Sequence, residues 1–402
     1  MIYLDWASTS PPNPELLAES ASVAESHFGN PSSAHALGKA AREKLDEARD
    51  RLLSSLVNEK TLSPSLRGRI AFTGSGTEAD SIVLLSLLRR SRTNASAPLH
   101  ILASAIEHSA IYEELRLFEK LGIACSFVSA RPDGLIDAES IAKAVKPETA
   151  LVTIMAVNNE TGAIQPLGEL VRAVVDKAAA LGKKTPLIHT DAVQALGKIE
   201  FDPYTAGISS AAFSAHKIGG PRGVGALWLR ESIAALSLGG GQEGGLRPGT
   251  ENLPGAWAFA RAAEYAKGSL EKRLARARML EAQLLEGLLA IRALPLPLGR
   301  QAGDARYSPF IVSASFPGLS GEVLVRALSD GSEDGSERIA VSTGAACSTN
   351  GQAKGRRVLE AMGLDAKLAF SAIRISTGET TEARDVETFL RSVGKIYAHL
   401  KA

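Results

Sequence analysis

The sequence predicts an α/β protein with a mostly parallel sheet that carries helices on both faces. Short apolar runs alternate with helical segments from about residue 69 onward, and most of the runs are too short to be helices. The runs are 70–72, 101–103, 123–128, 151–156, 187–189, 211–213 and 226–229, and most of them end at Gly, Asn, Asp or His. Functional groups are therefore expected just beyond the carboxyl ends of these strands.

Size and composition bound the number of domains and the kind of partner. At 402 residues the chain exceeds the usual size of a single core, so we expect two domains, the larger with one wide sheet. The 45 basic side chains nearly balance the 44 acidic ones, which argues against direct binding of nucleic acid or of a membrane surface. The first residues lack the pattern of a signal peptide, and no apolar run is long enough to cross a bilayer. We therefore expect a cytoplasmic protein.

Two helices are expected ahead of the sheet. The first begins at Glu15, after an extended Pro-rich connector, and ends near residue 28. The second runs from about His35 to Leu56, and its apolar side chains recur at helical spacing on one face. The side chains on that face are Leu37, Ala41, Leu45, Ala48 and Leu52.

The last part of the chain predicts a smaller α+β domain. A glycine-rich stretch at 238–250 precedes a long helical pattern at 253–290, which would bridge the two domains. Beyond it, strand-like runs at 310–315, 339–341 and 371–376 mix with helical segments at 321–328 and 355–362 and with an amphipathic terminal helix. We expect the large domain to span 14–262 and the small domain to combine 1–13 with 263–402.

Polar groups follow five of the strand-like runs. They are Gly76 and Thr77, His108, Asn159, Asp191 with Gln194, and Ser214 with His216 and Lys217. Taken alone, each has an ordinary explanation: Asp191 would be a helix cap, His108 a satisfied histidine and Lys217 a solvated loop lysine. Because all of them fall at the same edge of the predicted sheet, a shared site is the better interpretation.

Lys217 is the first candidate for covalent chemistry. It lies between a strand-like run and a glycine-rich turn, where its neighbours can hold it and reduce its hydration. Reduced hydration lowers the pKa of an amine and favours the free base that a Schiff base with an aldehyde cofactor requires. The backbone amides of Gly76 and Thr77, which open a helix, are suited to hold a phosphate, although such a turn is often only a tight connection.

The two cysteines have different surroundings. Two cysteines in so long a chain do not make a disulfide framework. Cys125 falls in a buried-strand pattern, where a cysteine behaves as a small apolar side chain. Cys347 follows Ser-Thr-Gly-Ala-Ala in a small, polar stretch, which is where a reactive thiol would lie. Metal sites have no support, because His and Cys are sparse and lack ligand spacing.

Taken together, these segments resemble the cysteine desulfurases of the NifS/IscS-like group. The resemblance covers nearly the whole chain, and it is carried by 3–5, 28–33, 74–80, 107–108, 158–162, 191–194, 214–217, 239–252 and 344–347. It implies the aspartate-aminotransferase-like fold of pyridoxal-phosphate (PLP) enzymes, fold type I, with a seven-stranded, mostly parallel sheet in the large domain. The small domain would then carry the Cys347 loop.

The resemblance also implies a role for each candidate residue. Lys217 would hold PLP covalently, Asp191 would bind the ring nitrogen, and His108 would stack on the ring and move protons. Asn159 and Gln194 would bind the phenolic oxygen, and Gly76, Thr77, Ser214 and His216 would bind the phosphate. Thr250 would reach the phosphate of a second subunit, which implies a homodimer. Arg374, together with Asn159, would bind the substrate, with Arg374 on its carboxylate.

The implied reaction is the removal of sulfur from L-cysteine. It would give L-alanine and a persulfide on Cys347, which would pass to a sulfur acceptor such as an iron–sulfur scaffold or a tRNA-modifying sulfur carrier. A selenocysteine lyase, another aminotransferase-like enzyme and a non-catalytic sulfur-relay scaffold are the alternatives. An acidic Gly/Ser stretch at 329–338 departs from the family pattern near the Cys347 loop, and its role stays open. So do the identity of the acceptor and a transient iron–sulfur species at Cys347.

Overall fold

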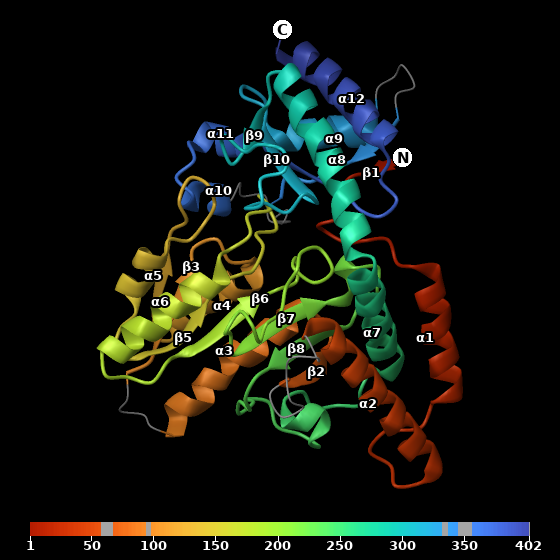
Figure 1. Ribbon diagram of the computed structural model, residues 1–402, viewed down its shortest axis with the longest axis vertical. Helices are drawn as coiled ribbons and strands as arrows, with labels where there is room; N and C mark the ends of the chain where they lie inside the picture. The colour runs from red at the N-terminus through yellow and green to blue at the C-terminus, as the bar shows by residue number, and fades with distance from the viewer. Residues whose placement is uncertain (58–66, 94–97, 332–336, 345–355, 402) are drawn as a thin grey trace.

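The computed structural model describes residues 1–57, 67–93, 98–331, 337–344 and 356–401 (Figure 1). Its central element is a seven-stranded sheet of order β2-β8-β7-β6-β5-β3-β4. The strands are β2 (Arg69–Thr73), β3 (His100–Ser104), β4 (Ala124–Val128), β5 (Thr149–Thr153), β6 (Leu187–Asp191), β7 (Ser210–Ser214) and β8 (Gly225–Leu229). Each strand contains or overlaps one of the apolar runs, so the predicted sheet is confirmed.

The sheet is parallel except at one strand. β4, β3, β5, β6 and β7 pair in parallel, and β8 runs antiparallel to both β7 and β2. The parallel strands carry their last residues to a common edge, and the opening residue of β8, Gly225, pairs there with Ser214 and Thr73. This edge is where the predicted functional groups have to lie.

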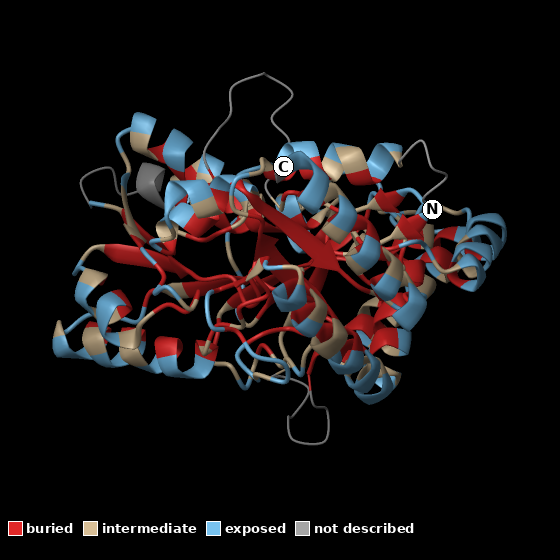
Figure 2. Cartoon of the chain, turned by 90° about the horizontal axis from the view of Figure 1, so that it is seen from above, coloured by how far each residue is buried: buried red, intermediate tan, exposed pale blue. Residues whose placement is uncertain are grey.

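Helices cover both faces of the sheet. α3 (Gly76–Thr93) and α4 (Ser109–Lys120) share an apolar core with one face. On the other face lie α1 (Pro14–Ser26), α2 (Ala36–Leu56), α5 (Ala138–Ala144), α6 (Leu167–Ala180) and α7 (Leu253–Gly268). Figure 2 shows the buried sheet between helices whose outer surfaces are exposed. A sheet covered on both faces accounts for strands that read as continuous apolar runs.

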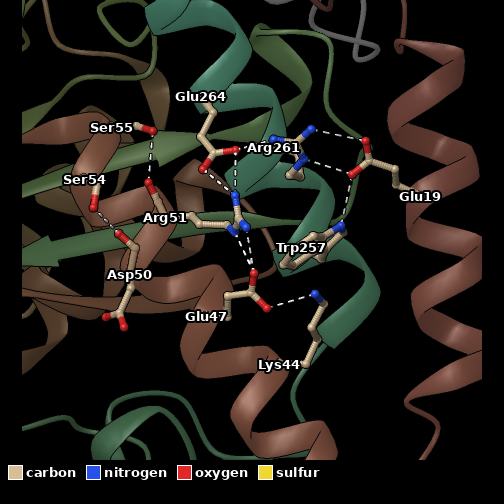
Figure 3. Close-up of polar contacts among 10 residues, drawn as sticks. All are labelled: Glu19, Lys44, Glu47, Asp50, Arg51, Ser54, Ser55, Trp257, Arg261 and Glu264. Atoms are coloured by element: carbon tan, nitrogen blue, oxygen red, sulfur yellow. Dashed lines mark hydrogen bonds and ion pairs between the residues drawn. The ribbon is translucent and has the colours of Figure 1, made fainter.

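α2 packs on α7 through the predicted apolar face, with one exception. Ala41, Leu45, Ala48 and Leu52 are buried, whereas Leu37, in the first turn, is 50% exposed. An ion-pair network borders the contact, as Figure 3 shows. Its links are Arg51 with Glu47 and Glu264, and Arg261 with Glu264 and Glu19, at 2.5 to 2.9 Å. These side chains are partly exposed, so packing rather than charge holds the two helices together.

A second apolar core lies at the other end of the molecule. It is formed by α8 (Leu270–Ala290), α9 (Gly321–Asp330) and α12 (Ala383–Lys401) against a sheet of order β12-β10-β9. These strands are β9 (Leu294–Leu296), β10 (Ile311–Ser315) and β12 (Ala372–Ser376), and the short helices α10 (Arg357–Ala361) and α11 (Ala366–Phe370) precede β12. β1 (Ile2–Tyr3) pairs with β11 (Ile339–Ala340), and Ile2 and Leu4 belong to this core. The N-terminal arm thus packs on the C-terminal part, while the domain boundaries stay a prediction.

Two features of this part differ from the sequence interpretation. The pattern predicted one helix over 253–290, but the chain breaks it at Ser269, between α7 and α8. Gly268 and Ser269 are weak helix formers, and the Ser269 hydroxyl donates to the carbonyl of Tyr265 at 2.7 Å. β9 was not predicted at all, because Pro295 stands in its middle. Proline is compatible with an edge strand, which is where β9 lies.

Candidate active site

Lys217 follows the carboxyl end of β7 in a short 3₁₀ helix, η2 (Ala215–Lys217). Its Nζ atom donates to the backbone oxygens of Ala7 and Ser8, at 2.8 and 2.7 Å. Burial, together with the charge of Arg374, lowers the pKa of Lys217 to about 8. The amine is therefore easier to deprotonate than that of a solvated lysine.

Asp191 is the last residue of β6 and is buried. Its Oδ1 atom accepts a hydrogen bond from the backbone N–H of Val193 at 2.9 Å. Burial raises the pKa of Asp191, while the charges of His108 and Lys217 lower it. The mutual influence of these three groups shows that the ends of β3, β6 and β7 deliver them to one place.

His108 caps the N-terminus of α4. Its Nδ1 atom accepts from the backbone N–H of Ala110 at 3.2 Å, so the proton of the neutral ring lies on Nε2. Burial lowers the pKa of His108, although the Asp191 carboxylate acts in the opposite direction. His108 is therefore a neutral imidazole at pH 7, with one N–H available to the site.

Glu107 is a site neighbour that the sequence interpretation did not assign. It is fully buried, and its Oε1 atom accepts from the Ser104 hydroxyl and from the backbone N–H of Met155, the latter at 2.8 Å. Burial raises the pKa of Glu107 to about 7. Arg357 donates to the backbone oxygens of Ala105 and Glu107. The β3–α4 turn, which carries His108, is thus held in place by hydrogen bonds to the Glu107 side chain and to the backbone oxygens of Ala105 and Glu107.

The turn from β2 into α3 meets the end of β7. A Cβ atom at Gly76 would lie 2.7 Å from Val193 Cγ2 and 3.5 Å from Ser214 Cβ, so only glycine fits without a shift there. As the first two residues of α3, Gly76 and Thr77 carry backbone N–H groups that the helix itself cannot satisfy. The turn therefore combines a close approach with available donors, which suits a phosphate.

His216 follows Ser214 by two residues and contacts the N-terminal segment. Its Nδ1 atom is 3.0 Å from Thr9 Oγ1, and its backbone oxygen accepts from both the N–H and the hydroxyl of Ser10. Burial, followed by the charge of Lys217, lowers the pKa of His216 to about 4. His216 is thus neutral near pH 7.

Arg374 reaches the site from β12 in the C-terminal part. Its Nη1 atom donates to the backbone oxygen of Asn159 at 2.9 Å. Its Nη2 atom donates to Asp5 Oδ1 at 2.8 Å and to Ser8 Oγ at 2.6 Å. Its Nε atom is buried and has no partner among the described residues. A nearly buried guanidinium that already holds a carboxylate is chemically suited to a carboxylate ligand.

The loop with Asn159 is organised by its neighbour Asn158. Asn158 Oδ1 accepts from the backbone N–H groups of Glu160 and Thr161, at 3.0 and 2.9 Å, and its Nδ2 atom donates to the oxygen of Ile106. These bonds leave the half-buried Asn159 at the tip of the turn. The structure thus joins Asn159 to the site through Arg374.

Gln194 lies in the turn after Asp191 and is buried. Its Nε2 atom donates to the Ala7 oxygen at 2.8 Å, and its Oε1 atom accepts from Lys198 Nζ at 2.6 Å. The Ala7 oxygen is also a partner of Lys217. Gln194 and Lys217 are therefore neighbours, as predicted. The N-terminal segment as a wall of the site, and Lys198 behind it, were not predicted.

Two predicted residues are not among those that the described part of the chain brings to this cluster. Thr250 is exposed between η3 (Gln242–Gly245) and α7, and no hydrogen bond links it to the other candidates in the described chain. Cys347 and part of the acidic stretch at 329–338 lie outside the described residues. The segment just before Cys347 is described: Ser342 pairs with Arg374, whose N–H donates to the Ser342 oxygen at 2.6 Å. The last described residues before Cys347 therefore lie beside Arg374.

Cys125 is less buried than predicted, because β4 is the edge strand of the sheet. Burial still raises the pKa of its thiol to about 11, so Cys125 is not a reactive thiolate. Over the described residues, no group of His, Cys, Asp and Glu side chains could hold a metal ion. No described helix is both long enough and apolar enough to cross a membrane.

A groove of about 560 Å³ between α2 and α7 is a poor candidate for catalysis. Its walls are Glu43, Asp46, Glu47, Asp50, Arg51, Ser54 and Glu264. Several of these side chains already bond one another in the network of Figure 3. The cluster of Lys217, Asp191 and His108 at the strand ends instead combines an amine, a buried carboxylate and a neutral imidazole.

The chain has known relatives over its full length. The family model for class-V aminotransferases matches residues 2–389. The chain belongs to the class-V aminotransferase family. Within this family, it is 32% identical to the cysteine desulfurase IscS 1 of Archaeoglobus fulgidus, over 100% of this chain and 98% of the relative. It is 34% identical to the mitochondrial cysteine desulfurase of Saccharomyces cerevisiae, over 98% of this chain and 74% of the relative.

Solved structures of this family share the fold. A NifS-like protein superposes with a TM-score of 0.85 at 33% identity, covering 99% of each chain. SspA in complex with cysteine superposes with a TM-score of 0.74 at 26% identity, covering 94% of this chain and 98% of the other. The predicted resemblance to the NifS/IscS-like group is thereby confirmed, as is the predicted fold. Because one relative is mitochondrial, the cytoplasmic location stays a prediction.

Proposed function

We propose that the protein is a PLP-dependent cysteine desulfurase, with its site at the sheet edge around Lys217. The observation that carries the proposal is the meeting of Lys217, Asp191 and His108 at the ends of three strands. The amine has a lowered pKa, the carboxylate is buried, and the imidazole is neutral. The relatives with this fold carry the name cysteine desulfurase, which supports the same chemistry.

The residues fit PLP by their chemistry. The Lys217 amine suits an aldehyde, Asp191 suits a protonated ring nitrogen, and the turn at Gly76 suits a phosphate. A side chain at position 76 would collide with Val193, so glycine is required there. A ligand at this turn would therefore meet only backbone atoms of Gly76. When bound, PLP would supply an electron sink for the carbanion at the substrate Cα.

The chain's own groups divide the remaining work. Lys217 Nζ would take the proton from the substrate Cα, which its lowered pKa favours. His108 Nε2 would hold a proton for the departing sulfur or the product carbon, since its Nδ1 is engaged by Ala110. Arg374 would bind the substrate carboxylate in place of Asp5. Cys347 would accept the sulfur as a persulfide and pass it to an acceptor such as an iron–sulfur scaffold or a tRNA-modifying carrier.

The proposed activity is tested by product analysis with purified protein and L-cysteine. We expect L-alanine and transferable sulfur in equal amounts, and no comparable turnover of a keto acid or preference for selenocysteine. Cys347→Ser should keep the cofactor absorbance and lose persulfide formation. Keto-acid transamination at the cysteine rate, or full sulfur release by Cys347→Ser, would contradict the proposal.

We also propose a homodimer with composite sites. Thr250 is exposed and unconnected to the site of its own chain in the described residues, so it is available to a second subunit. Lys217→Ala and Thr250→Val chains should each be impaired alone. Co-refolded, they should regain activity, because one hybrid site would combine the intact Lys217 and Thr250. No gain over the separate chains would contradict a composite site.

A further inference from the structure

Lys198 is a buried lysine without an acidic partner. Its residue is only 4% exposed, and no salt bridge to it exists among the described residues. The charged groups that act on it are all cationic: Lys217, Arg273 of α8 and Arg374 of β12. Burial, and then these cations, lower the pKa of Lys198 well below its usual value. A neutral amine in the interior still needs a hydrogen-bond partner, because an unpaired polar group is costly there.

The turn that carries Lys198 is fixed by contacts with two helices. The backbone oxygen of Gly197 accepts from Arg273 Nη1 at 2.8 Å. Gly197 has a φ of +65°, and a Cβ atom there would lie 2.5 Å from the Cβ of Ala266 in α7. The Lys198 N–H donates to the oxygen of Ala195 at 3.0 Å. The backbone at this point is therefore held in place, and the side chain extends from a fixed base.

The amine of Lys198 is linked to Lys217 through three hydrogen bonds. Lys198 Nζ donates to Gln194 Oε1 at 2.6 Å. Gln194 Nε2 donates to the Ala7 oxygen at 2.8 Å, and Lys217 Nζ donates to the same oxygen at 2.8 Å. The amide of Gln194 therefore lies between the two lysines. Its oxygen accepts from Lys198, and its nitrogen donates to the Ala7 oxygen that Lys217 also contacts.

This arrangement defines the orientation of the amide. The Ala7 oxygen can only accept, so it selects the NH₂ end of Gln194, and the carbonyl end is then left to accept from Lys198 Nζ. If the amide turned over, its oxygen would face the Ala7 oxygen, and a contact between two acceptors is unfavourable inside a protein. After the bond to Ala7, one N–H of Gln194 is left for another acceptor.

We propose that Lys198 is a positioning residue of the active site, which fixes the Gln194 amide with its NH₂ group toward Ala7 and the reacting centre. The inference rests on the proposed function only for the identity of the acceptor of the second N–H, the phenolic oxygen of the cofactor. As a positioning residue, Lys198 is not proposed to contact substrate or cofactor itself. It acts through Gln194, so substitution of Lys198 should have no further effect on the active site once Gln194 has been replaced.

The first test uses cofactor-free protein labelled with ¹⁵N-glutamine. The side-chain amide signal of Gln194 is assigned by its loss in Gln194→Leu. Lys198→Met removes the donor but keeps an unbranched apolar chain. We expect exchange of the Gln194 amide protons to become at least about tenfold faster in this variant, since the amide loses its anchor. An unchanged exchange rate would overturn the positioning role, whatever the activity of the protein.

The second test uses PLP-loaded protein and the pH midpoint of its visible absorbance. Gln194→Leu and Lys198→Met should move this midpoint in the same direction, Lys198→Met by about 0.5 pH unit or more. In the double variant the midpoint should stay where Gln194→Leu alone puts it. Additive shifts would overturn the action through Gln194. A changed unfolding midpoint with no change in the absorbance titration would show a merely structural role, which also contradicts the proposal.

Two further variants keep the tests decisive. Lys184→Met, at an exposed lysine, should leave both readouts unchanged. Lys198→Gln keeps a side-chain donor and should shift the absorbance midpoint less than Lys198→Met. If Lys198→Met does not fold, the same cycle with Lys198→Gln decides. Wild-type protein without a PLP absorbance would contradict the proposed function alone, because the amide exchange would still decide the role of Lys198.

Discussion

The Nζ atom of Lys217 and the Nε2 atom of Gln194 donate to the same carbonyl oxygen, that of Ala7, each at 2.8 Å. Three distant segments thus meet at one acceptor, although Ala7 and Lys217 are 210 positions apart in the chain. The N-terminal segment supplies both backbone oxygens to which the amine donates, those of Ala7 and Ser8. This contact makes residues 5–10 part of the site.

Burial of the Lys217 amine should be measurable as a pH-dependent loss of stability. Its pKa is about 8 in the folded protein and 10.5 for a free lysine, so between these values the unfolded chain binds more protons. The free energy of unfolding therefore rises with pH across that window, and below pH 8 the buried charge costs stability. Cofactor-free Lys217→Met should be more stable at pH 7, by no more than about 3 kcal/mol, at about 1.4 kcal/mol per pKa unit. Urea unfolding at pH 7 and pH 10 should show the difference shrinking, and a constant difference would contradict the lowered pKa.

Substitutions of His108 should separate its role as the N-cap of α4 from its role in catalysis. Asn is a good N-cap, so His108→Asn should retain most of the stability, whereas His108→Ala should lose about 1 kcal/mol. Both variants lack the Nε2 proton, and both should lose about 10²–10⁴-fold in kcat. Urea unfolding and cysteine turnover are the two measurements. Near-normal turnover by His108→Asn would show that His108 is only a cap.

Arg374 should govern recognition of the substrate carboxylate. Arg374→Gln should raise the KM for L-cysteine by roughly 10²-fold, because it removes a charge-assisted pair. Binding of cysteamine, which lacks the carboxylate, should change far less. Arg306→Gln, at an exposed arginine, is the matched control and should leave both ligands unaffected. Equal losses for cysteine and cysteamine would indicate that Arg374 acts only by holding the Asn159 loop.

The buried ion pair of Glu281 and Arg300 in the C-terminal part of the chain should be costly to break. Arg300 Nη2 lies 2.6 Å from Glu281 Oε1, both side chains are buried, and Arg300 Nη1 also donates to the Thr161 oxygen near the site. Glu281→Ala leaves a buried charge unpaired and should cost about 3–5 kcal/mol. Glu139→Ala, which breaks the exposed pair with Lys143, should have no measurable effect in the same urea titration. Similar losses in both variants would contradict this ranking.

The sequence predicted those features that rest on local patterns. Short apolar runs predicted the sheet strands, and the polar residues after them placed Lys217, Asp191 and His108 at one edge. Residues without such a pattern were missed. The carbonyls of Ala7 and Ser8 became partners of Lys217 only through tertiary contact, which no local spacing encodes.

Lys198 illustrates the same limit. In the sequence it is one of many lysines, and only its burial and its bond to Gln194 distinguish it. The break at Ser269 between α7 and α8 was missed for a different reason, because the apolar pattern of 253–290 continues through it. The weak helix formers Gly268 and Ser269 end α7 despite that pattern.

Peptide mapping after borohydride reduction tests the central claim most directly. Borohydride fixes PLP to the lysine that carries it, and the modified peptide identifies that lysine by mass. We predict a pyridoxyl group on Lys217, with loss of the visible absorbance in wild-type protein and no label in Lys217→Ala. An unlabelled Lys217, or a label on the buried Lys198, would contradict this assignment.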